Sequence, residues 1–503
     1  MNYAELFRVT LPETAMEVAA LLVLVVDLGF LRKAAIQVRA ATAAMLGIVG
    51  CALAVWSMLL QAQGGLVYAG SGEVLLASGG SATVAQIGVL ALTVLTLLLL
   101  AEAEFTEHVG EYVAVLLMSA TGGLLISAAQ DLLVIFIGLE LLSLGLYILT
   151  AFAKRSAKSA EASIKYYLFG GMSAAFLLFG FSYLYGVTGS TNLSAIMVAT
   201  QGPKGMLAAP LLAVALVMLA AGLGFKVAAV PFHLWAPDAY EGAPAPAAAF
   251  IASVSKVASF ALLISIGTAM LRAADLARAV PEHAGVTGQW SLILAVMAGV
   301  SIVMGNLAAL AQVSVRRLLA YSAIAHAGYV LLGLAYFSST ARSAQAVLYY
   351  VLTYGLTTVG AFGVVAVVER ATGSDKMDAF LGLHKRSPLL AAVLLVLFLS
   401  LAGIPPLVGF WAKFNLFAAV LEVAPAGAAL GLVALAVMMS AVSLYYYLQV
   451  LKRAYVMPAP DETRMTPHPV TQTVLVAVTL MVVLLGCLPG LLQGWIAGFY
   501  PGM

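Results

Sequence analysis

The sequence predicts an all-α polytopic membrane protein. Of its 503 residues, 63% are hydrophobic and only 9% are charged, and the mean hydropathy is +1.05. A water-soluble globular protein of this composition could not cover its surface with polar side chains. Apolar stretches of roughly 17 to 25 residues, each long enough to cross a bilayer, recur along the chain with little polar sequence between them. No soluble domain is indicated.

About fourteen transmembrane spans are expected. In chain order they cover 11–31, 37–60, 82–103, 111–129, 131–153, 160–187, 207–230 continuing to 240, 245–271, 290–312, 318–338, 344–369, 388–421, 427–452 and 470–495. The first span is too long for a cleaved signal peptide, Arg8 precedes it, and no small-residue cleavage pattern follows it. We therefore expect it to remain in the mature protein.

The distribution of basic residues predicts an orientation in which both termini lie on the outer side. With that orientation, fifteen Lys and Arg residues fall in inner loops and five in outer ones. The inner group is Arg32, Lys33, Arg39, Lys154, Arg155, Lys158, Arg316, Arg317, Arg370, Lys376, Lys385, Arg386, Lys452, Arg453 and Arg464, and the outer group is Arg8, Lys204, Arg272, Arg278 and Arg342. This asymmetry is typical of membrane proteins and requires an even number of spans.

Four lysines cannot be assigned to any loop: Lys165, Lys226, Lys256 and Lys413. Glu140 lies equally deep, within the stretch DLLVIFIGLELLSLGLYILTAF. A charge at the bilayer centre costs about 2.5 to 3.5 kcal/mol, so these side chains must face protein or water. Because burial disfavours the charged form and a nearby carboxylate favours it, some of these lysines should release a proton near neutral pH. The alternative is a snorkelling side chain or a static ion pair, which fits Lys165 best because it is only some six residues into its helix.

Two of the expected helices contain breaks. The first break is in AAVPFHLWAPDAYEGAPAP, with Pro231 and the nearby His233, and the second is in LSLAGIPPLVGFWAKF, with Pro405 and Pro406. Proline frees backbone carbonyls in a membrane helix, and only a neighbour, a side chain or water can then satisfy them. The breaks are therefore candidate functional places, although a plain kink is the alternative.

The spacing of these features suggests an internal repeat. Lys226 and Lys413, each beside a break, are 187 residues apart, and Glu140 and His326 are 186 apart. A repeat of five spans would place its two copies in opposite orientations, a pattern found along transport pathways. The expected units are an N-terminal three-helix segment (1–109), a first five-helix repeat (110–272), a second, inverted repeat (289–455), and a C-terminal loop with the last helix (456–503).

No residue pattern indicates a cofactor or metal in this chain. Cys51 and Cys487 lie in separate spans without CxxC spacing, and no carboxylate–histidine cluster has the spacing of metal ligands. Nucleotide-binding glycine motifs and a nucleophile elbow are also missing from the sequence. His233 and His326 lie inside spans, where a histidine can relay protons or simply be a hydrogen-bonded core residue.

Several stretches together resemble a known family. PFHLWAPDAYEGAPAPAAAFIASVSKVASFALL, at 231–263, is similar to the signature of the antiporter-like membrane subunits of respiratory complex I, and YEGAP followed by SVSK resembles the N type rather than the L or M type. KSAEASIKYYLFG, RRLLAYSAIAHAGY and AGIPPLVGFWAKF support this resemblance, which is strong over roughly 110–455.

The resemblance implies a role in proton translocation driven by redox chemistry elsewhere in a larger complex. By motif position, Glu140 and Lys226 would form a carboxylate–lysine pair, and Lys256 would be the central lysine. Lys413 would be the terminal lysine, Lys165 matches a lysine of the N type, and His233, His326 and internal water would bridge the gaps. The family also implies partner subunits of the membrane arm, with flavin, iron–sulfur clusters and quinone held outside this chain, in a bacterial inner membrane.

Three alternatives remain at the level of the sequence. A subunit of a multi-subunit Na+/H+ antiporter shares the breaks and the lysines, and a membrane-bound hydrogenase or a photosynthetic relative of complex I would carry nearly the same residues. A scaffold that pumps nothing is the third, but it could replace the five buried ionisable groups with apolar residues. We expect contact with the lipid bilayer and no nucleic acid partner.

Overall fold

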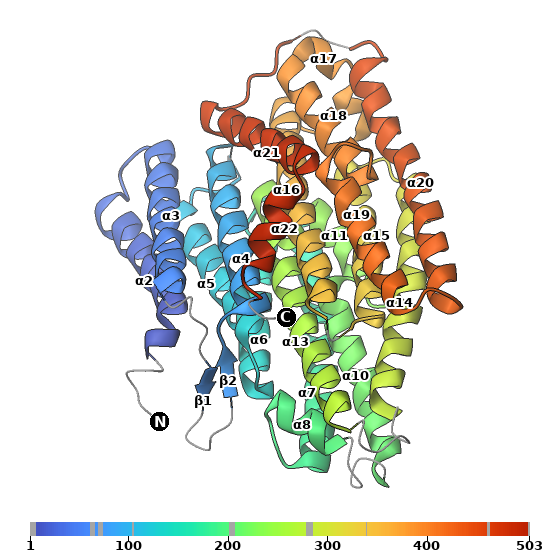
Figure 1. Ribbon diagram of the computed structural model, residues 1–503. Coiled ribbons are helices and arrows are strands. Elements are labelled where there is room, and N and C mark those ends of the chain that lie inside the picture. The colour runs from blue at the N-terminus through green and yellow to red at the C-terminus, as the bar shows by residue number, and fades with distance from the viewer. Residues whose placement is uncertain are drawn as a thin grey trace.

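The structure is a computed structural model that describes residues 7–60, 66–68, 74–102, 105–200, 207–277, 285–338, 340–459 and 463–500. Two basic residues of the expected outer loops, Lys204 and Arg278, lie outside the described residues. The described chain is helical, apart from one small hairpin and the connecting loops (Figure 1).

Three groups of helices follow one another along the chain. The first contains α2 (Leu11–Val25), the π-helix η1 (Val26–Phe30), α3 (Ile36–Leu60), α4 (Gly80–Leu98) and the 3-10 helix η2 (Leu99–Glu102). The second contains α5 (Val109–Ala128), α6 (Leu132–Thr150), α7 (Ala157–Thr188), α8 (Leu193–Thr200), α10 (Ala209–Val227), α11 (Trp235–Gly242), α12 (Ala245–Ala252) and α13 (Val254–Ala277). The third contains α14 (Gly285–Leu310), α15 (Val315–Ala335), α16 (Ala341–Thr372), the 3-10 helix η3 (Met377–Phe380), α17 (Leu383–Arg386), α18 (Pro388–Ala402), α19 (Val408–Val423), α20 (Ala428–Tyr455), α21 (Pro469–Cys487) and α22 (Gly490–Ala497).

Twelve helices of the described chain are long and apolar enough to cross a membrane. They match twelve of the fourteen expected spans. The other two expected spans are built from shorter pieces: 11–31 is the 15-residue α2 followed by the π-helix η1, and 388–421 is divided into α18 and α19, of 15 and 16 residues. The prediction of a polytopic helical membrane protein is confirmed, with twelve candidate spans rather than fourteen.

A short hairpin joins α3 to α4, which the hydropathy pattern did not predict. Strand β1 (Leu66–Tyr68) pairs antiparallel with β2 (Val74–Ala77), with Leu66 opposite Ala77 and a register shift after Val67. Its strands are only three and four residues long. Hydropathy averaged over the length of a transmembrane helix does not detect elements this short.

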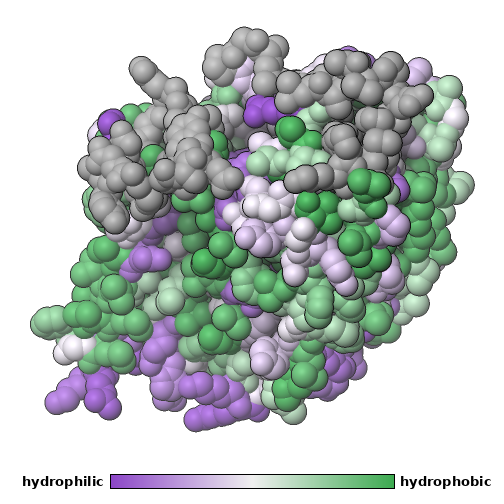
Figure 2. All heavy atoms as spheres, turned by 90° about the horizontal axis from the view of Figure 1, so that it is seen from below, coloured by the Kyte–Doolittle hydropathy of each residue, from purple (hydrophilic) through white to green (hydrophobic). Residues whose placement is uncertain are grey.

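The helices differ in how much of their surface the chain itself covers. The most apolar 18-residue window of the span Ala245–Ala273 is 100% buried and that of Val315–Ala335 is 94% buried, whereas the corresponding windows of α7 and α20 are 33% and 22% buried. Helices α12, α13 and α15 are therefore central, and α7 and α20 are peripheral. Large apolar side chains are exposed on the peripheral helices, and Figure 2 shows hydrophobic residues over broad areas of the flanks. Such surfaces suit lipid or neighbouring subunits.

Two loops of the chain are built alike. The 32-residue helices α7 and α16 both end in Thr-Gly-Ser, with Gly189 and Gly373 in the left-handed conformation. After each glycine the chain forms an isolated bridge to the residue that caps the start of another helix: Asn192 to Asp131 before α6, and Lys376 to Ser314 before α15. The elements that follow these loops, α8 and α17, lie at opposite ends of the bundle (Figure 1).

Candidate proton pathway

The first helix break separates α10 from α11. Helix α10 ends at Val227, Ala228 adopts the left-handed conformation, and the helical path resumes at Trp235. Two backbone groups that the break leaves without helical partners form other hydrogen bonds. The Phe225 carbonyl accepts from the Trp235 indole N–H at 2.9 Å, and the Val230 N–H donates to Ser301 Oγ at 2.9 Å. The break is thus a defined structure inside the bundle, held by side chains of neighbouring helices.

Lys226 lies on the last turn of α10 and is 5% exposed. Its Nζ donates to Ser143 Oγ of α6 at 2.7 Å. Glu140 is on the same side of α6, one turn before Ser143, and is half-buried. The Glu140 carboxylate and the Lys226 ammonium interact electrostatically but form no direct ion pair within 4 Å. Ser143 therefore occupies the position next to Lys226 that a direct carboxylate partner would take.

Lys256 is the central cation of the bundle and is 4% exposed. It lies at the start of α13, just after Ser253, where α12 and α13 are interrupted. Its Nζ donates to the Val227 carbonyl at 3.0 Å and to the Ala323 carbonyl of α15 at 2.8 Å. Because Val227 directly follows Lys226, two lysines from different helices meet at the same helix end.

His326 continues this series of groups on α15. It is 5% exposed, its Nδ1 forms a hydrogen bond with Tyr350 Oη at 2.8 Å, and its buried Nε2 has no partner. The His326 ring interacts electrostatically with both Lys256 and Lys413. It therefore lies between the central lysine and the last one.

The second break separates α18 from α19. Helix α18 ends at Ala402, Gly403 adopts a φ of 89°, and α19 begins at Val408. Lys413 on α19 is 6% exposed, and its Nζ donates to the Leu401 and Ala402 carbonyls at 3.0 and 2.9 Å and to Ser440 Oγ at 2.7 Å. The same ammonium lies 5.5 Å from the centre of the Tyr329 ring.

The two breaks share one chemical device. In each, the last carbonyls of a half-helix accept hydrogen bonds from a buried lysine that belongs to another helix: Lys256 at the end of α10, and Lys413 at the end of α18. The carboxyl end of a helix carries partial negative charge and unsatisfied carbonyls. A helix that stops inside the membrane domain thus supplies a binding place for a cation without using a carboxylate.

Lys165 lies in a different environment. Its side chain is 42% exposed and forms ion pairs with Glu161 at 2.7 Å and with Asp238 of α11 at 2.8 Å. Asp238 also pairs with Arg317 of α15 at 2.6 Å. Lys165 therefore joins a network that ties α11 to α7 and α15, and within the described chain no hydrogen bond links it to the three buried lysines.

His233 is buried within the first break but is not joined to the lysines by any hydrogen bond between described residues. Its Nδ1 is buried without a partner. Pro231 precedes it, and the peptide bond between Val230 and Pro231 is cis, as is the bond between Pro405 and Pro406 in the second break. The structure therefore brings together Lys226, Lys256, His326 and Lys413, with Glu140 nearby, and within the described chain no hydrogen bond or ion pair joins His233 or Lys165 to them.

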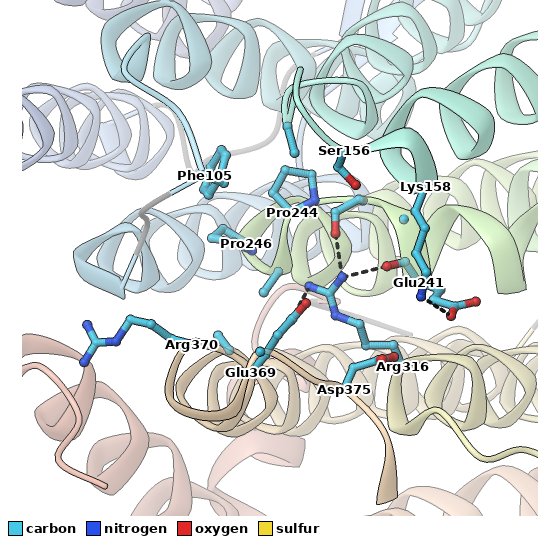
Figure 3. A pocket seen from close by; sticks show the side chains of 16 residues that line it. Phe105, Ser156, Lys158, Glu241, Pro244, Pro246, Arg316, Glu369, Arg370 and Asp375 are labelled. Atoms are coloured by element: carbon cyan, nitrogen blue, oxygen red, sulfur yellow. Dashed lines mark hydrogen bonds and ion pairs between the residues drawn. The ribbon is translucent and has the colours of Figure 1, made fainter. Parts of the chain in front are cut away.

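A pocket of about 530 Å³ opens at the end of the bundle where the basic loops gather. Arg316, only 3% exposed, projects into its wall between α11 and α16 (Figure 3). Its guanidinium donates to the Glu241 and Ala243 carbonyls at 2.8 and 2.7 Å and pairs with Glu369 at 3.2 Å. Pro244 and Pro246, at the junction of α11 with α12, complete the apolar part of the lining.

Several residues of this arrangement were not predicted from the sequence. Ser143 and Ser440 accept hydrogen bonds from lysine ammonium groups, and Tyr350 bonds His326. Asp238 pairs with Lys165 and also with Arg317. Hydroxyl side chains in apolar helices are common, so only their position beside a lysine would mark them. Within the described ranges, no group of three or more His, Cys, Asp and Glu side chains could hold a metal ion.

Comparison with known proteins identifies the family of the chain. Residues 129–440 match the family described as NADH:quinone oxidoreductase/Mrp antiporter, transmembrane. NADH-quinone oxidoreductase subunit N 2 of Acidobacterium capsulatum is 49% identical over 509 aligned residues, which cover 99% of each chain. A chain of respiratory complex I from Thermus thermophilus with bound aureothin is 33% identical, covers 96% of this chain and 98% of its own, and superposes with a TM-score of 0.76.

A third likeness bears on the antiporter alternative. A chain of the Mrp complex from Dietzia sp. has a TM-score of 0.78 but only 22% identity, and 51% of that chain is covered against 97% of this one. That likeness shows a shared fold alone, whereas the near-complete match at 49% identity is to a subunit N. The chain therefore belongs to the NADH:quinone oxidoreductase/Mrp antiporter family, in its NADH-quinone oxidoreductase subunit N branch.

Proposed function

We propose that this multi-pass membrane protein moves protons through a line of buried groups: Glu140, Lys226, Lys256, His326 and Lys413. As a subunit N it is part of the membrane arm of NADH-quinone oxidoreductase. The observation that carries the proposal is that three lysines, each at most 6% exposed, are held by hydroxyls and half-helix carbonyls rather than by carboxylates.

This kind of site favours proton exchange over a permanent charge. A carboxylate in direct contact would fix a lysine in its charged form, whereas carbonyls and a serine hydroxyl can accept a hydrogen bond from an ammonium and leave the neutral amine possible. A change of one pKa unit corresponds to about 1.4 kcal/mol. Small movements of Glu140 relative to Lys226 are therefore enough to change how often the lysine carries a proton.

The order of the groups defines the path that a proton would take through the chain. Lys226 and Lys256 share the end of α10, because Lys256 donates to the carbonyl of the residue next to Lys226. His326 interacts with both Lys256 and Lys413 and has one free ring nitrogen to accept or donate a proton. Internal water fills the remaining gaps in this proposal, with His233 in the first break as an additional exchange group. The redox groups that drive transfer belong to partner subunits.

We assign the inner side of the membrane to the end of the bundle at which α17 lies (Figure 1). The pocket at Arg316 is lined by Glu369, Arg370 and Gly373 at the end of α16, shortly before α17 in the chain. Thirteen of the fifteen basic residues counted for inner loops come after residue 38 in the sequence. Some of them form ion pairs with acidic residues of neighbouring loops, as Arg453 does with Asp378 at 3.3 Å. Both termini would then be outside. In this orientation the pocket is the entrance for protons, and Lys165, through Asp238, holds α11 at its edge.

An inverted repeat explains the two matching loops. The Thr-Gly-Ser stretches are 184 residues apart, and each places a bridge partner beside a helix cap, one at each end of the bundle. The backbone pattern agrees too: Leu132 N–H donates to Thr191 O, and Val315 N–H donates to Asp375 O. These similarities support two units at about 110–272 and 289–455 that run in opposite directions, with one broken helix in each.

The test is Lys256→Ala in the assembled enzyme, with Lys452→Ala as the control. Lys452 is also a lysine on a helix, but it is exposed on the last turn of α20. We expect Lys256→Ala to reduce proton pumping at least several-fold in sealed membrane vesicles, and Lys452→Ala to leave it unchanged. Pumping would be followed with a pH-sensitive dye while NADH is oxidised.

Two further readings make the result specific. Each variant chain should co-purify with the complex in normal amount, which shows that the complex has assembled. Full pumping stoichiometry in Lys256→Ala would contradict the proposed line of groups. A similar loss in Lys452→Ala would show that the effect arises from the membrane domain as a whole.

A further inference from the structure

A second buried carboxyl group lies far along the chain from the lysine pathway. Glu13, in the first turn of α2, is only 6% exposed. Its Oε1 is within 3.4 Å of the Gln86 amide of α4, and its Oε2 is buried without a hydrogen-bond partner. No Lys, Arg or His among the described residues forms an ion pair with it.

The orientation of Gln86 is fixed by a second contact. Its Nε2 also donates to the Leu124 carbonyl of α5 at 3.2 Å. A carbonyl can only accept, so the amide nitrogen of Gln86 must point toward both Leu124 and Glu13. Gln86 therefore donates to one oxygen of the Glu13 carboxyl group and leaves the other oxygen to a different partner.

There is space beside Glu13 for a hydrogen-bond partner of its second carboxyl oxygen. A cavity of about 20 Å³ adjoins Glu13 and is lined also by Ser78, Thr83 and Gln86. One water molecule needs about 10 to 15 Å³ of such space and two to four polar partners. The cavity meets both requirements, while its remaining lining includes apolar side chains such as Met58 and Leu76.

The protonation state of Glu13 follows from this environment. An ionised carboxylate buried without a cation costs several kcal/mol, and a single amide does not offset that cost. A neutral carboxyl group instead has an O–H donor, which needs an acceptor at the position of the small cavity. Two further groups act on Glu13: its own backbone N–H favours a negative charge, but less than burial disfavours it, and the Glu17 carboxylate also disfavours it.

We infer that Glu13 is a proton-binding site, separate from the lysine pathway, in which a protonated carboxyl group donates to one water molecule held by α2, α4 and the hairpin. The site is at the end of the bundle that carries β1 and β2 (Figure 1). A proton can exchange there through that water without crossing the rest of the membrane domain. The inference does not depend on the lysine pathway.

The test uses dicyclohexylcarbodiimide on the intact complex in its native membrane. A carboxylic acid protonates this apolar reagent, and the resulting carboxylate adds to its central carbon to give an O-acylisourea. The acyl group then shifts from oxygen to nitrogen, which yields a stable N-acylurea with no leaving group. Mass spectrometry of the peptides then measures the adduct on each residue. We expect the adduct on Glu13 at neutral pH and its loss at alkaline pH, with none on Glu422, which is exposed and pairs with Arg342 at 2.6 Å.

Two variants decide the cause of the labelling. Gln86→Lys places a cation beside Glu13, so the carboxyl group should ionise and the adduct should fall about tenfold or more. Gln86→Leu removes the amide without adding charge, so the adduct should persist to higher pH than in the wild type. An unmodified Glu13 at neutral pH, or equal labelling in the wild type and Gln86→Lys, would overturn the inference. Co-purification of each variant chain with the complex in normal amount serves as the check on assembly.

Discussion

At the scale of single residues, the partners of the buried lysines determine what these lysines can do. Ser143 is the one side chain that bonds the Lys226 ammonium, at 2.7 Å, among the described residues. Glu140 acts on that lysine from a greater distance, without direct contact. The serine therefore takes the place beside Lys226 that a direct ion pair would need, and in our proposal this leaves Lys226 free to change its protonation state.

Ser143→Ala should weaken proton pumping without blocking assembly. A hydrogen bond to a charged group contributes about 1.5 to 3 kcal/mol, so its loss should leave Lys226 charged roughly tenfold less often. We expect pumping to fall by a similar factor, measured as the pH change per NADH oxidised. Ser163→Ala is the control, because Ser163 lies on the exposed side of α7 and bonds only its own helix. Equal pumping by the two variants would remove Ser143 from the pathway.

The residue types were predictable from the sequence, but their partners were not. Four lysines outside the loops identify themselves by charge in apolar stretches, and three of them are buried. Lys165 looks the same in sequence, yet it pairs with Asp238, 73 residues away. Glu13 was not singled out from the sequence, because an interfacial carboxylate would also lie near the start of a span, and its contact with Gln86 of α4 arises only in the folded chain.

At the scale of elements, the ends of half-helices hold two of the three buried lysines, Lys256 and Lys413. Proline and glycine predicted where helices would stop, because they remove a donor or permit a positive φ. The sequence did not reveal which carbonyls would be used, since the Ala323 carbonyl comes from a helix 67 residues away from Lys256. The spacing of 187 residues between Lys226 and Lys413 was also a weaker guide than it seemed: the two lysines lie on opposite sides of their breaks.

Gly403→Ala should disturb Lys413 directly. Gly403 has a φ of 89°, and an added Cβ would lie 3.0 Å from Lys413 Cδ and 3.2 Å from Nζ. A substitution there carries backbone strain of about 1 to 3 kcal/mol and also pushes the ammonium away from the end of α18. We expect pumping to fall several-fold, as measured in sealed vesicles.

Gly189→Ala separates the two effects of that substitution. Gly189 also has a positive φ, of 75°, but an added Cβ there would meet no atom within 4 Å. Its strain should therefore lower the melting temperature of the complex by an amount similar to that of Gly403→Ala while pumping stays normal. Equal pumping in both variants would show that the position of Lys413 is not critical.

At the scale of the whole molecule, hydropathy determined the class of fold, and tertiary structure determined the finer organisation. Twelve spans can be recognised in the sequence because each is a continuous apolar helix. The broken helix of α18 and α19 is different, because each half, of 15 and 16 residues, is too short to count as a span by itself. The Thr-Gly-Ser stretches at 188–190 and 372–374 are the sequence signal that supports the proposed repeat. Three residues are too short a signal until the bridges to Asp131 and Ser314 give them a structural meaning.

The orientation predicts which loops face each compartment. Arg155 lies in an exposed basic loop beside the pocket end, and Ala426 lies in the exposed loop between α19 and α20. With Cys51 and Cys487 replaced by alanine, Arg155→Cys should react with a membrane-impermeant maleimide in inside-out vesicles, and Ala426→Cys should react in intact spheroplasts. Each should be protected in the other preparation, because the reagent cannot cross the bilayer. The reverse pattern would invert the membrane orientation and, with it, place the pocket at Arg316 on the side where protons leave.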